Sequence, residues 1–351
     1  MNLRKTFLLV CMLLSYGVAS AYDFSLTTDG QTLYFKIISE KNQTAEVTYK
    51  GGINDHNQAV YTGDIVIHAK VRHDGVVYNI VGISDKAFSG AAALEGITLP
   101  LGMKYVGDFA FEDCTSLSKV VFPGNAIKFG QGTFFRCTSL RDISLGSDWK
   151  EVNLSMFRWS EDLVSITIPA KVEKIQNMKS LKHLEQILVD VNNTRFTSIG
   201  GLLYNKDATV LYGCPRAYCG EVKVANETEV ITPGAFIDCP GITKVDLPAG
   251  LVSMSFNEFS RMPALETIIF RSEIPVLTAE TAQGRCMLLQ VASPDVKIIV
   301  PKSALKVYKQ NLEWAEGEYK EIGKDVPYTL RGEELVCEKQ LKGVKKFNKY
   351  E

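Results

Sequence analysis

A 23-residue repeat is the feature that most constrains how this chain can fold. Four phenylalanines recur at that spacing: Phe88, Phe111, Phe134 and Phe157. The residues five positions before and six positions after each ring are also apolar, and a short strand-like run follows each copy. A unit of this length cannot bury its own apolar face. The copies are therefore expected to stack into a solenoid around one continuous core.

The repeat continues beyond an irregular middle section. The period returns at Phe236 and Phe259, again 23 residues apart, whereas Ser180 stands where the next ring after Phe157 is expected. Between them, residues 190–217 contain two apolar runs around the polar stretch 205–209, which predicts a β-hairpin projecting from the stack. The solenoid is assigned to residues 82–285, with this hairpin insertion near 190–217.

The two ends lack the repeat. Residues 22–81 alternate polar and apolar side chains between glycines, a strand-and-turn pattern that predicts an all-β N-terminal cap. Residues 286–323 hold an apolar strand, 298–300, and then a segment, 303–314, with one apolar helical face and Ser303 as its N-cap, which predicts a strand-helix C-terminal cap. The charged residues 324–351 are expected to form a solvated tail.

The N-terminus and the charge bear on location and partners. Residues 1–21 have a basic start, a short apolar stretch and a small-residue end, the pattern of a secretory signal peptide. A membrane anchor is the alternative, but an apolar run this short does not cross roughly 30 Å of hydrocarbon. We expect an exported protein, periplasmic, secreted or on the cell surface. A net charge of −1 argues against nucleic acid as a partner.

Two pairs of cysteines are candidates for a disulfide bond. Cys114 and Cys137 share one repeat position, where a buried thiol ladder is the simpler alternative to a disulfide. Cys214 and Cys219 flank Pro215 and are the best candidates for a disulfide in an oxidising compartment.

Several phrases resemble the bacterial BspA-type leucine-rich repeat. They are Val106–Leu117, Ile231–Cys239 and Phe196–Ile199 with Leu203–Asp207. The resemblance covers roughly residues 80–323 and implies a β-rich leucine-rich-repeat solenoid. It also implies export and a surface-binding or adhesion role, with no shared catalytic residues. Ser180 and the pair Met254 and Ser255 depart from the family pattern and place the regularity of those coils in question.

No catalytic, cofactor or metal template fits the residues. His68 and His73 are spaced five apart around an expected strand end and do not form a HExxH pair. No Gly-x-Ser-x-Gly elbow occurs, and adjacent carboxylates such as Glu333 and Glu334 are typical of a solvated surface. We therefore predict a non-enzymatic protein with no cofactor and no metal.

The repeat also predicts a binding surface. Alternate strand residues point away from the core and form exposed columns on one sheet face. The candidate partner-binding residues on this face are Thr98, Lys119, Val121, Asp142, Ser144, Thr167, Leu188, Lys244, Asp246, Thr267 and Ile269. An inert solvated face is the alternative, although the apolar members favour contact.

The expected hairpin supplies a second candidate surface. Tyr204 and Tyr212 would bind a partner there, unless they pack on the stack. The leading hypothesis is macromolecule binding, of a protein in preference to a polysaccharide. The alternative is a structural or envelope-assembly module without a foreign ligand.

Overall fold

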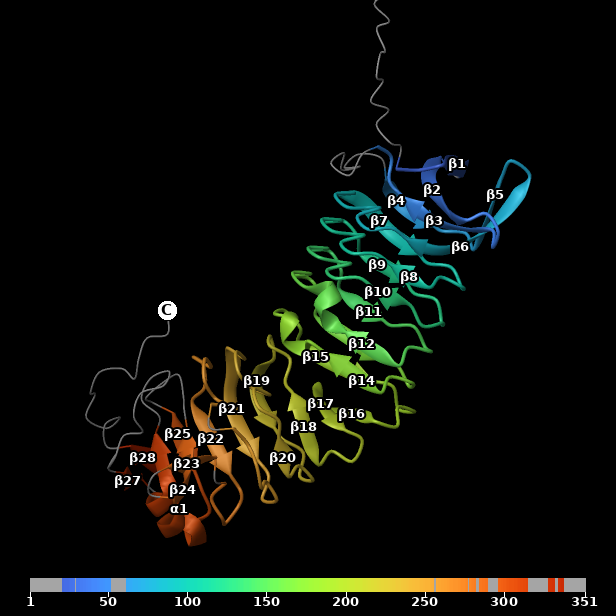
Figure 1. Cartoon of the computed structure of the whole chain (residues 1–351). Helices are drawn as coiled ribbons and strands as arrows, with labels where there is room; N and C mark the ends of the chain where they lie inside the picture. Colours follow the sequence, from blue (N-terminus) through green and yellow to red (C-terminus); the bar gives the residue numbers. More distant parts are fainter. Residues whose placement is uncertain are drawn as a thin grey trace, which may run out of the picture.

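The protein is an elongated stack of short strands that runs from β1 at one end to the C-terminal strands at the other (Figure 1). The computed structural model describes residues 21–28, 30–51, 61–255, 257–276, 278–281, 284–289, 296–314, 328–331 and 334–337. The expected signal peptide, apart from its last residue, lies outside these ranges.

Each coil contributes one strand to a first ladder of parallel strands. These strands are β4 (Thr62–Val66), β7 (Ala93–Thr98), β9 (Lys119–Val121), β11 (Asp142–Ser144), β13 (Ser165–Ile168), β15 (Gln186–Val189), β19 (Cys219–Lys223), β21 (Gly241–Leu247), β22 (Thr267–Phe270) and β25 (Lys297–Ile299). They pair as three sheets, β4–β7–β9, β11–β13–β15 and β19–β21–β22–β25. Ile97 pairs with Val120 and Val245 with Ile268, so pairing follows the 23-residue step.

Shorter strands form a second ladder. They are β6 (Val76–Ile83), β8 (Tyr105–Val106), β10 (Lys128–Phe129), β12 (Glu151–Asn153), β14 (Lys174–Gln176), β18 (Val210–Gly213) and β20 (Val230–Ile231). The pairings are β6–β8–β10, β12–β14 and β18–β20, all parallel. This ladder is therefore interrupted twice, between β10 and β12 and again between β14 and β18.

Other strands lie at the ends of the stack and at this interruption. They are β1 (Phe24–Thr28), β2 (Gln31–Ser39), β3 (Thr44–Thr48), β5 (Lys70–His73), β16 (Phe196–Ile199), β17 (Leu202–Asn205), β23 (Ala279–Thr281), β24 (Gly284–Leu289), β26 (Leu312–Trp314), β27 (Tyr328–Arg331) and β28 (Glu334–Cys337). The N-terminal strands β1, β2 and β3 pair antiparallel, and β3 joins the stack through β6. Both β4 and β6 already belong to the ladders, so the first coil begins before residue 82.

The phenylalanine column forms the centre of the first half of the stack. Adjacent ring centroids are 5.0 Å apart for Phe88 and Phe111, 5.2 Å for Phe111 and Phe134, and 5.4 Å for Phe134 and Phe157. The interplanar angles are 9°, 4° and 19°, and all four rings are fully buried. Tyr61 precedes Phe88 at 4.7 Å. The column therefore begins with a residue that lies outside the sequence repeat.

A second column explains why a small residue with a thiol or hydroxyl group follows Phe111, Phe134 and Phe157. The thiol of Cys114 donates to the Phe88 carbonyl at 3.1 Å, and the thiol of Cys137 donates to the Phe111 carbonyl at 3.0 Å. The hydroxyl of Ser160 makes the equivalent bond to Phe134 at 3.1 Å. Each side chain thus satisfies a buried carbonyl of the preceding coil, which would otherwise carry a desolvation penalty. Cys114 and Cys137 are free thiols.

Glycine is required where the turns approach each other most closely. Asp85 Oδ1 accepts the N–H of Asp108 at 2.7 Å, and Asp108 Oδ1 accepts the N–H of Gln131 at 2.7 Å. A Cβ at Gly107 would lie 2.5 Å from the Asp85 backbone nitrogen, and one at Gly130 would lie 2.4 Å from that of Asp108. Glycine therefore permits the aspartate ladder to form.

The coil that contains Met178 and Ser180 is irregular, and its register differs from the one that the sequence predicts. The N–H of Leu181 donates to the Met178 carbonyl, as that of Ser160 does to Phe157. Met178 therefore occupies the ring position, and the assignment of Ser180 to that position was wrong because this coil is shorter between its strand and its turn. In the next coil Cys214 donates its N–H to Ala235, the bond that Phe111 makes to Thr133.

Two consecutive coils therefore lack a ring, and the core divides there. One buried cluster ends at Leu203 and the other begins at Leu202. The expected hairpin is present as β17 and β18. It does not project, because β18 continues the second ladder by pairing with β20 and the β17 side chains are buried. Their apolar surface replaces the missing rings.

The C-terminal elements also differ from the expectation. After the short 3₁₀ turn η3 (Lys302–Ala304), helix α1 spans only Leu305–Asn311, and Leu312 begins β26. Ser303 is not the helix cap; its hydroxyl bonds to Glu273 at 3.0 Å. Tyr308 is buried and donates to the Ser272 carbonyl at 3.0 Å, which ties the helix to the last coils. Part of the expected tail forms the β27–β28 hairpin beside β25.

One carboxylate lies inside the second half of the stack. Glu258 is fully buried, and its oxygens accept the N–H groups of Gly234 at 2.6 Å and Phe236 at 3.3 Å. Burial raises the pKa of Glu258 to about 7, although these amide bonds and the charge of Lys179 act in the opposite direction. Glu258 therefore connects two turns, and burial makes ionisation of its carboxyl group unfavourable.

The stacked rings predict a large local contribution to stability. Phe111→Ala is expected to lower the free energy of unfolding by roughly 3–5 kcal/mol, because it removes a ring packed on both faces. Urea denaturation followed by circular dichroism measures the change. Leu101→Ala, at a side chain 70% exposed, is the control and is expected to stay within about 0.5 kcal/mol of the parent. A loss at Phe111 as small as that of the control would contradict the role of the column.

Glu258 predicts a pH dependence of stability. Its folded pKa of about 7 exceeds the ordinary value of 4.5, so the folded state binds the extra proton between these limits. Stability is therefore expected to fall as pH rises from 4.5 to 7. Glu258→Gln should reduce this fall by roughly 2 kcal/mol, measured by urea denaturation across the window. Glu266→Gln, on the exposed surface, should leave the profile unchanged; identical profiles for both variants would refute the prediction.

Candidate functional site

The sheet face formed by the first ladder carries an exposed apolar column in its N-terminal half. Val121 is 40% exposed and Leu188 is 42% exposed. Thr98 pairs with Val121, and Thr167 pairs with Leu188, so these residues lie in register on neighbouring strands. Val66 of β4 pairs with Thr98 and is 55% exposed, which extends the column by one coil.

The C-terminal half of the same face is closed by ion pairs. Asp246 is only 9% exposed, and both of its carboxylate oxygens accept from Arg271 at 2.7 Å. The prediction that Asp246 faces a partner was therefore wrong, because Arg271 covers and neutralises it. Lys244 pairs with Glu221 at 2.9 Å.

The remaining predicted residues of the face are placed as follows. Lys119 is exposed, and Thr267 and Ile269 are half-buried. Asp142 and Ser144 lie on β11, but their side chains are outside the described part of the chain.

The hairpin tyrosines have different environments. Tyr204 is fully buried, and its hydroxyl accepts the N–H of Ala225 at 3.3 Å. Its assignment as a partner-binding residue was therefore wrong, because it packs in the core at the division between the two clusters. Tyr212 is 40% exposed and contacts the Phe196 ring edge-to-face at 5.8 Å.

A groove of about 990 Å³ opens at the interruption of the second ladder. β14 contributes Lys174 and Ile175 to one side, and Tyr212 and Arg216 line another part. Its other walls are the segments 157–160, 177–183, 194–196 and 205–207. The groove includes both Phe157, the last ring of the column, and Met178, which replaces the next. It therefore occupies the place where the regular repeat is lost.

The groove is strongly basic. Glu173 and Asp207 are its acidic residues, and Glu173 lies 3.9 Å from Lys150 outside it. The basic side chains that line it are Arg158, Lys174, Lys179, Lys182, Arg195, Lys206 and Arg216. Seven cations against two carboxylates give this small area a charge very different from the chain's net charge of −1.

Some of these cations already have carboxylate partners. Lys174 lies 3.3 Å from Glu151, and Arg216 pairs with Asp238. Within the described residues, no carboxylate oxygen lies within the 4.0 Å ion-pair distance of a second group of cations. These are Arg158, Lys179, Lys182, Arg195 and Lys206. They hold the uncompensated charge of the groove.

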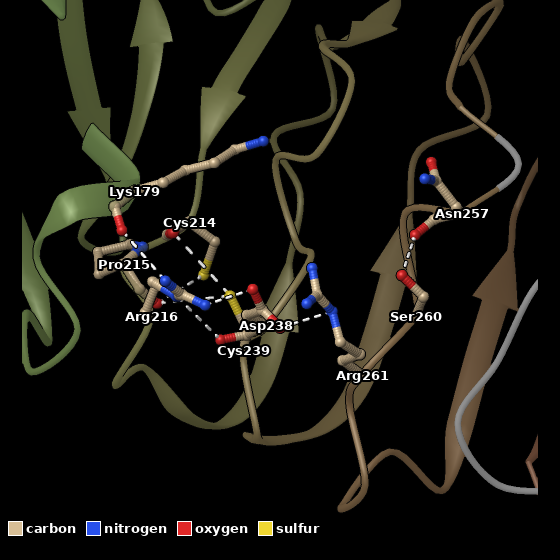
Figure 2. Close-up of polar contacts among 9 residues, drawn as sticks. All are labelled: Lys179, Cys214, Pro215, Arg216, Asp238, Cys239, Asn257, Ser260 and Arg261. Carbon is tan, nitrogen blue, oxygen red and sulfur yellow. Dashed lines mark hydrogen bonds and ion pairs between the residues drawn. The ribbon is translucent and has the colours of Figure 1, made fainter. Parts of the chain in front are cut away.

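A polar network fixes one end of the groove to the following coils (Figure 2). Arg216 donates to the Lys179 carbonyl at 3.1 Å and also pairs with Asp238. Asp238 binds Arg261 of the next coil at 2.8 Å. Arg216 therefore joins the irregular coil to the regular stack and is held in place by its bonds to Lys179 and Asp238.

An aromatic ring supports the opposite end. Trp159 is 40% exposed, and the Lys182 ammonium lies 4.3 Å from its ring centroid. The Arg158 guanidinium lies 6.0 Å from the same ring. These cation–π contacts hold both cations at the groove while leaving their charge without a carboxylate.

The expected Cys214–Cys219 disulfide is not formed. Both are free thiols; Cys214 is buried, whereas Cys219 is exposed at the start of β19. Cys214 instead occupies the buried ring position next to Cys239, and burial is the main cause that raises its thiol pKa. The sequence spacing allowed the pair, but the coil geometry directs the two side chains to different environments.

Within the described part of the chain, no group of three His, Cys, Asp or Glu side chains is placed to bind a metal ion. None of the helices in these residues has the length and apolar character of a membrane span.

The groove was missed by sequence reasoning, although two signals were present. The ring column fails after Phe157, and Lys171, Lys174, Lys179 and Lys182 follow within a short stretch. Val66 was missed because it lies before the repeat becomes regular. Its position became visible only through the pairing of β4 with β7.

The profile of the BspA type leucine rich repeat region matches residues 76–183 and 212–304 in six copies. The chain belongs to this family. The unmatched residues between the two segments contain β15, β16 and β17, where the structure departs from the regular coil. No curated protein matches the chain.

A solved structure shows the same fold. The crystal structure of the pneumococcal vaccine antigen PcpA is 14% identical, covers 83% of this chain and 97% of its own, and has a TM-score of 0.50. A leucine rich cell surface protein from Faecalibacterium prausnitzii is 20% identical, covers 84% of this chain and 96% of its own, and has a TM-score of 0.36.

The free thiols predict selective labelling. In the native state a maleimide should modify Cys219 and spare Cys114, Cys137, Cys214 and Cys239, because the reagent does not reach buried thiols. Burial also raises the pKa of the Cys137 and Cys214 thiols, which lowers their reactivity further. Peptide mapping by mass spectrometry identifies the labelled sites. Labelling after denaturation in urea is the control and should also reach these four buried thiols. A Cys214–Cys219 cross-linked peptide from unreduced protein would contradict the structure.

Proposed function

We propose that the protein is an exported, non-enzymatic binding protein with an adhesion-like role. Its sheet face engages a macromolecular partner, a protein in preference to a polysaccharide. Membership in the BspA-type family supports a protein-interaction or adhesion role. The likeness to the pneumococcal vaccine antigen PcpA supports the fold alone.

The observation that carries the proposal is the exposed apolar column. Val66, Val121 and Leu188 are each at least 40% exposed. Val66 and Val121 flank Thr98 in the β4–β7–β9 sheet, and Leu188 pairs with Thr167 in the next sheet. Exposure of an apolar side chain to water is unfavourable. Burial of that side chain against a partner lowers the free energy by roughly 25 cal/mol per Å² of apolar surface. Thr98 and Thr167 continue the column without charge, so a partner meets no desolvation penalty for ions there.

The rigid ladder favours binding over catalysis. Each member of the column lies on a strand that pairs with at least one neighbour, so little conformational entropy is lost on docking. The face is also flat and open, as a macromolecular partner requires, and a standard interface would bury about 800 Å² of it.

Paired charge substitutions test the face. Val121→Glu with Leu188→Glu should weaken binding by at least about tenfold, because the interface would bury two unpaired charges. The measurement is binding of the parent and the variant to arrays of extracellular matrix proteins and glycans, followed by titration of each positive. Val252→Glu with Ile274→Glu is the matched control, since both side chains are exposed and lie off this face.

The outcomes separate the two candidate functions. Equal loss in the test and control variants would refute docking on the sheet face. Silence of the parent on both arrays, together with self-association in sedimentation velocity, would favour the structural or envelope-assembly module.

A further inference from the structure

The interrupted second ladder leaves a strand at the edge of the groove. Among the described strands, β14 pairs with β12 alone and is the last member of a two-stranded sheet. In the regular coils β8 has a neighbour on each side, β6 and β10. The chain after β15 instead turns into the β16–β17 hairpin. An unpaired strand edge is a template for a further strand.

The groove lies along this edge and has room for a peptide. Lys174 and Ile175 of β14 form one wall, and residues 194–196, where the next coil diverges, form another. Its volume of about 990 Å³ is at the upper end of the range for small-ligand pockets, roughly 300–1,000 Å³. The space therefore holds a few residues of an extended chain where the regular solenoid would place its own strand.

The charge of the groove selects the occupant. Arg158, Lys182, Arg195 and Lys206 have no carboxylate at ion-pair distance in the described chain, whereas Asp207 is the acidic wall residue without a basic partner there. Trp159 holds two of the cations in place, so fewer side-chain rotamers are lost when an anion binds. Carboxylates of a partner would complete the ion pairs that elsewhere join successive coils.

We propose that this groove binds an acidic, extended peptide segment of a partner protein, which adds to β14 as a further strand. Strand pairing supplies the backbone hydrogen bonds, and the basic walls select glutamate or aspartate side chains. A sulfated sugar would meet the same cations but has no backbone to pair with the strand edge. The inference uses no residue of the sheet face, so either surface can fail its test while the other passes.

Fluorescence anisotropy with synthetic peptides tests the proposal on the full chain. The probe is a labelled hexapeptide of alternating glutamate and valine, and its affinity should fall as salt rises. Lys182→Glu with Arg195→Glu should weaken its binding by at least about tenfold, since two charge-assisted contacts are reversed. Lys104→Glu with Lys128→Glu makes the same change in net charge on exposed residues away from the groove and should alter binding by less than about twofold. Matching circular dichroism spectra and melting curves establish that both variants are folded.

Three further probes define the mode of binding. A lysine–valine hexapeptide should not bind, because its charge has the wrong sign. The glutamate–valine peptide with alternate N-methylated residues should bind at least about tenfold more weakly, because it cannot pair with a strand. Equal binding of the methylated peptide, equal loss in the two double variants, or no binding of the acidic hexapeptide would each overturn the proposal. Binding of a sulfated disaccharide in its place would assign the groove to an anionic glycan.

Discussion

The repeated contact between one coil and the next is the constraint on which the structure depends. Stacked rings lie 5.0–5.4 Å apart from Phe88 to Phe157. That spacing is compatible with the roughly 4.8 Å between hydrogen-bonded strands, so the ring column and the ladders advance together. The thiol and hydroxyl bonds to buried carbonyls, and the aspartate bonds to the turns, use the same step. The same repeat therefore both packs the apolar side chains and provides hydrogen-bond partners for the buried polar groups.

The same step arranges charges across the surface. Asp113 with Arg136 and Asp148 with Lys171 are pairs from consecutive coils, each separated by 23 residues. Such exposed pairs contribute little individually, typically about 0.2–1 kcal/mol. Their main effect is to leave most of the stack electrically balanced. The groove is the exception, because its coil is shorter and the next coil diverges before its side chains can complete the pairs.

The irregular coils therefore also form the groove that we propose as a binding site. Met178 and Cys214 replace two rings, the core divides at β17, and β14 is left as an edge. The regular part offers a different kind of surface, a rigid face whose apolar column follows from strand alternation. In the C-terminal half, Arg271 and Glu221 close that face over Asp246 and Lys244. The two candidate surfaces thus arise from regular and irregular parts of one solenoid.

The sequence by itself determined the solenoid, the position of its strands and the exposure of Val121 and Leu188, because equivalent residues one coil apart must meet when strands pair in register. It also located the hairpin. Only the tertiary structure decided that Tyr204 is buried, that Cys214 lies beside Cys239, that Arg271 covers Asp246, and that a basic groove forms next to β14. These features depend on how a shortened coil and an insertion redirect the chain. That path is set by packing between residues distant in sequence, which no local period records.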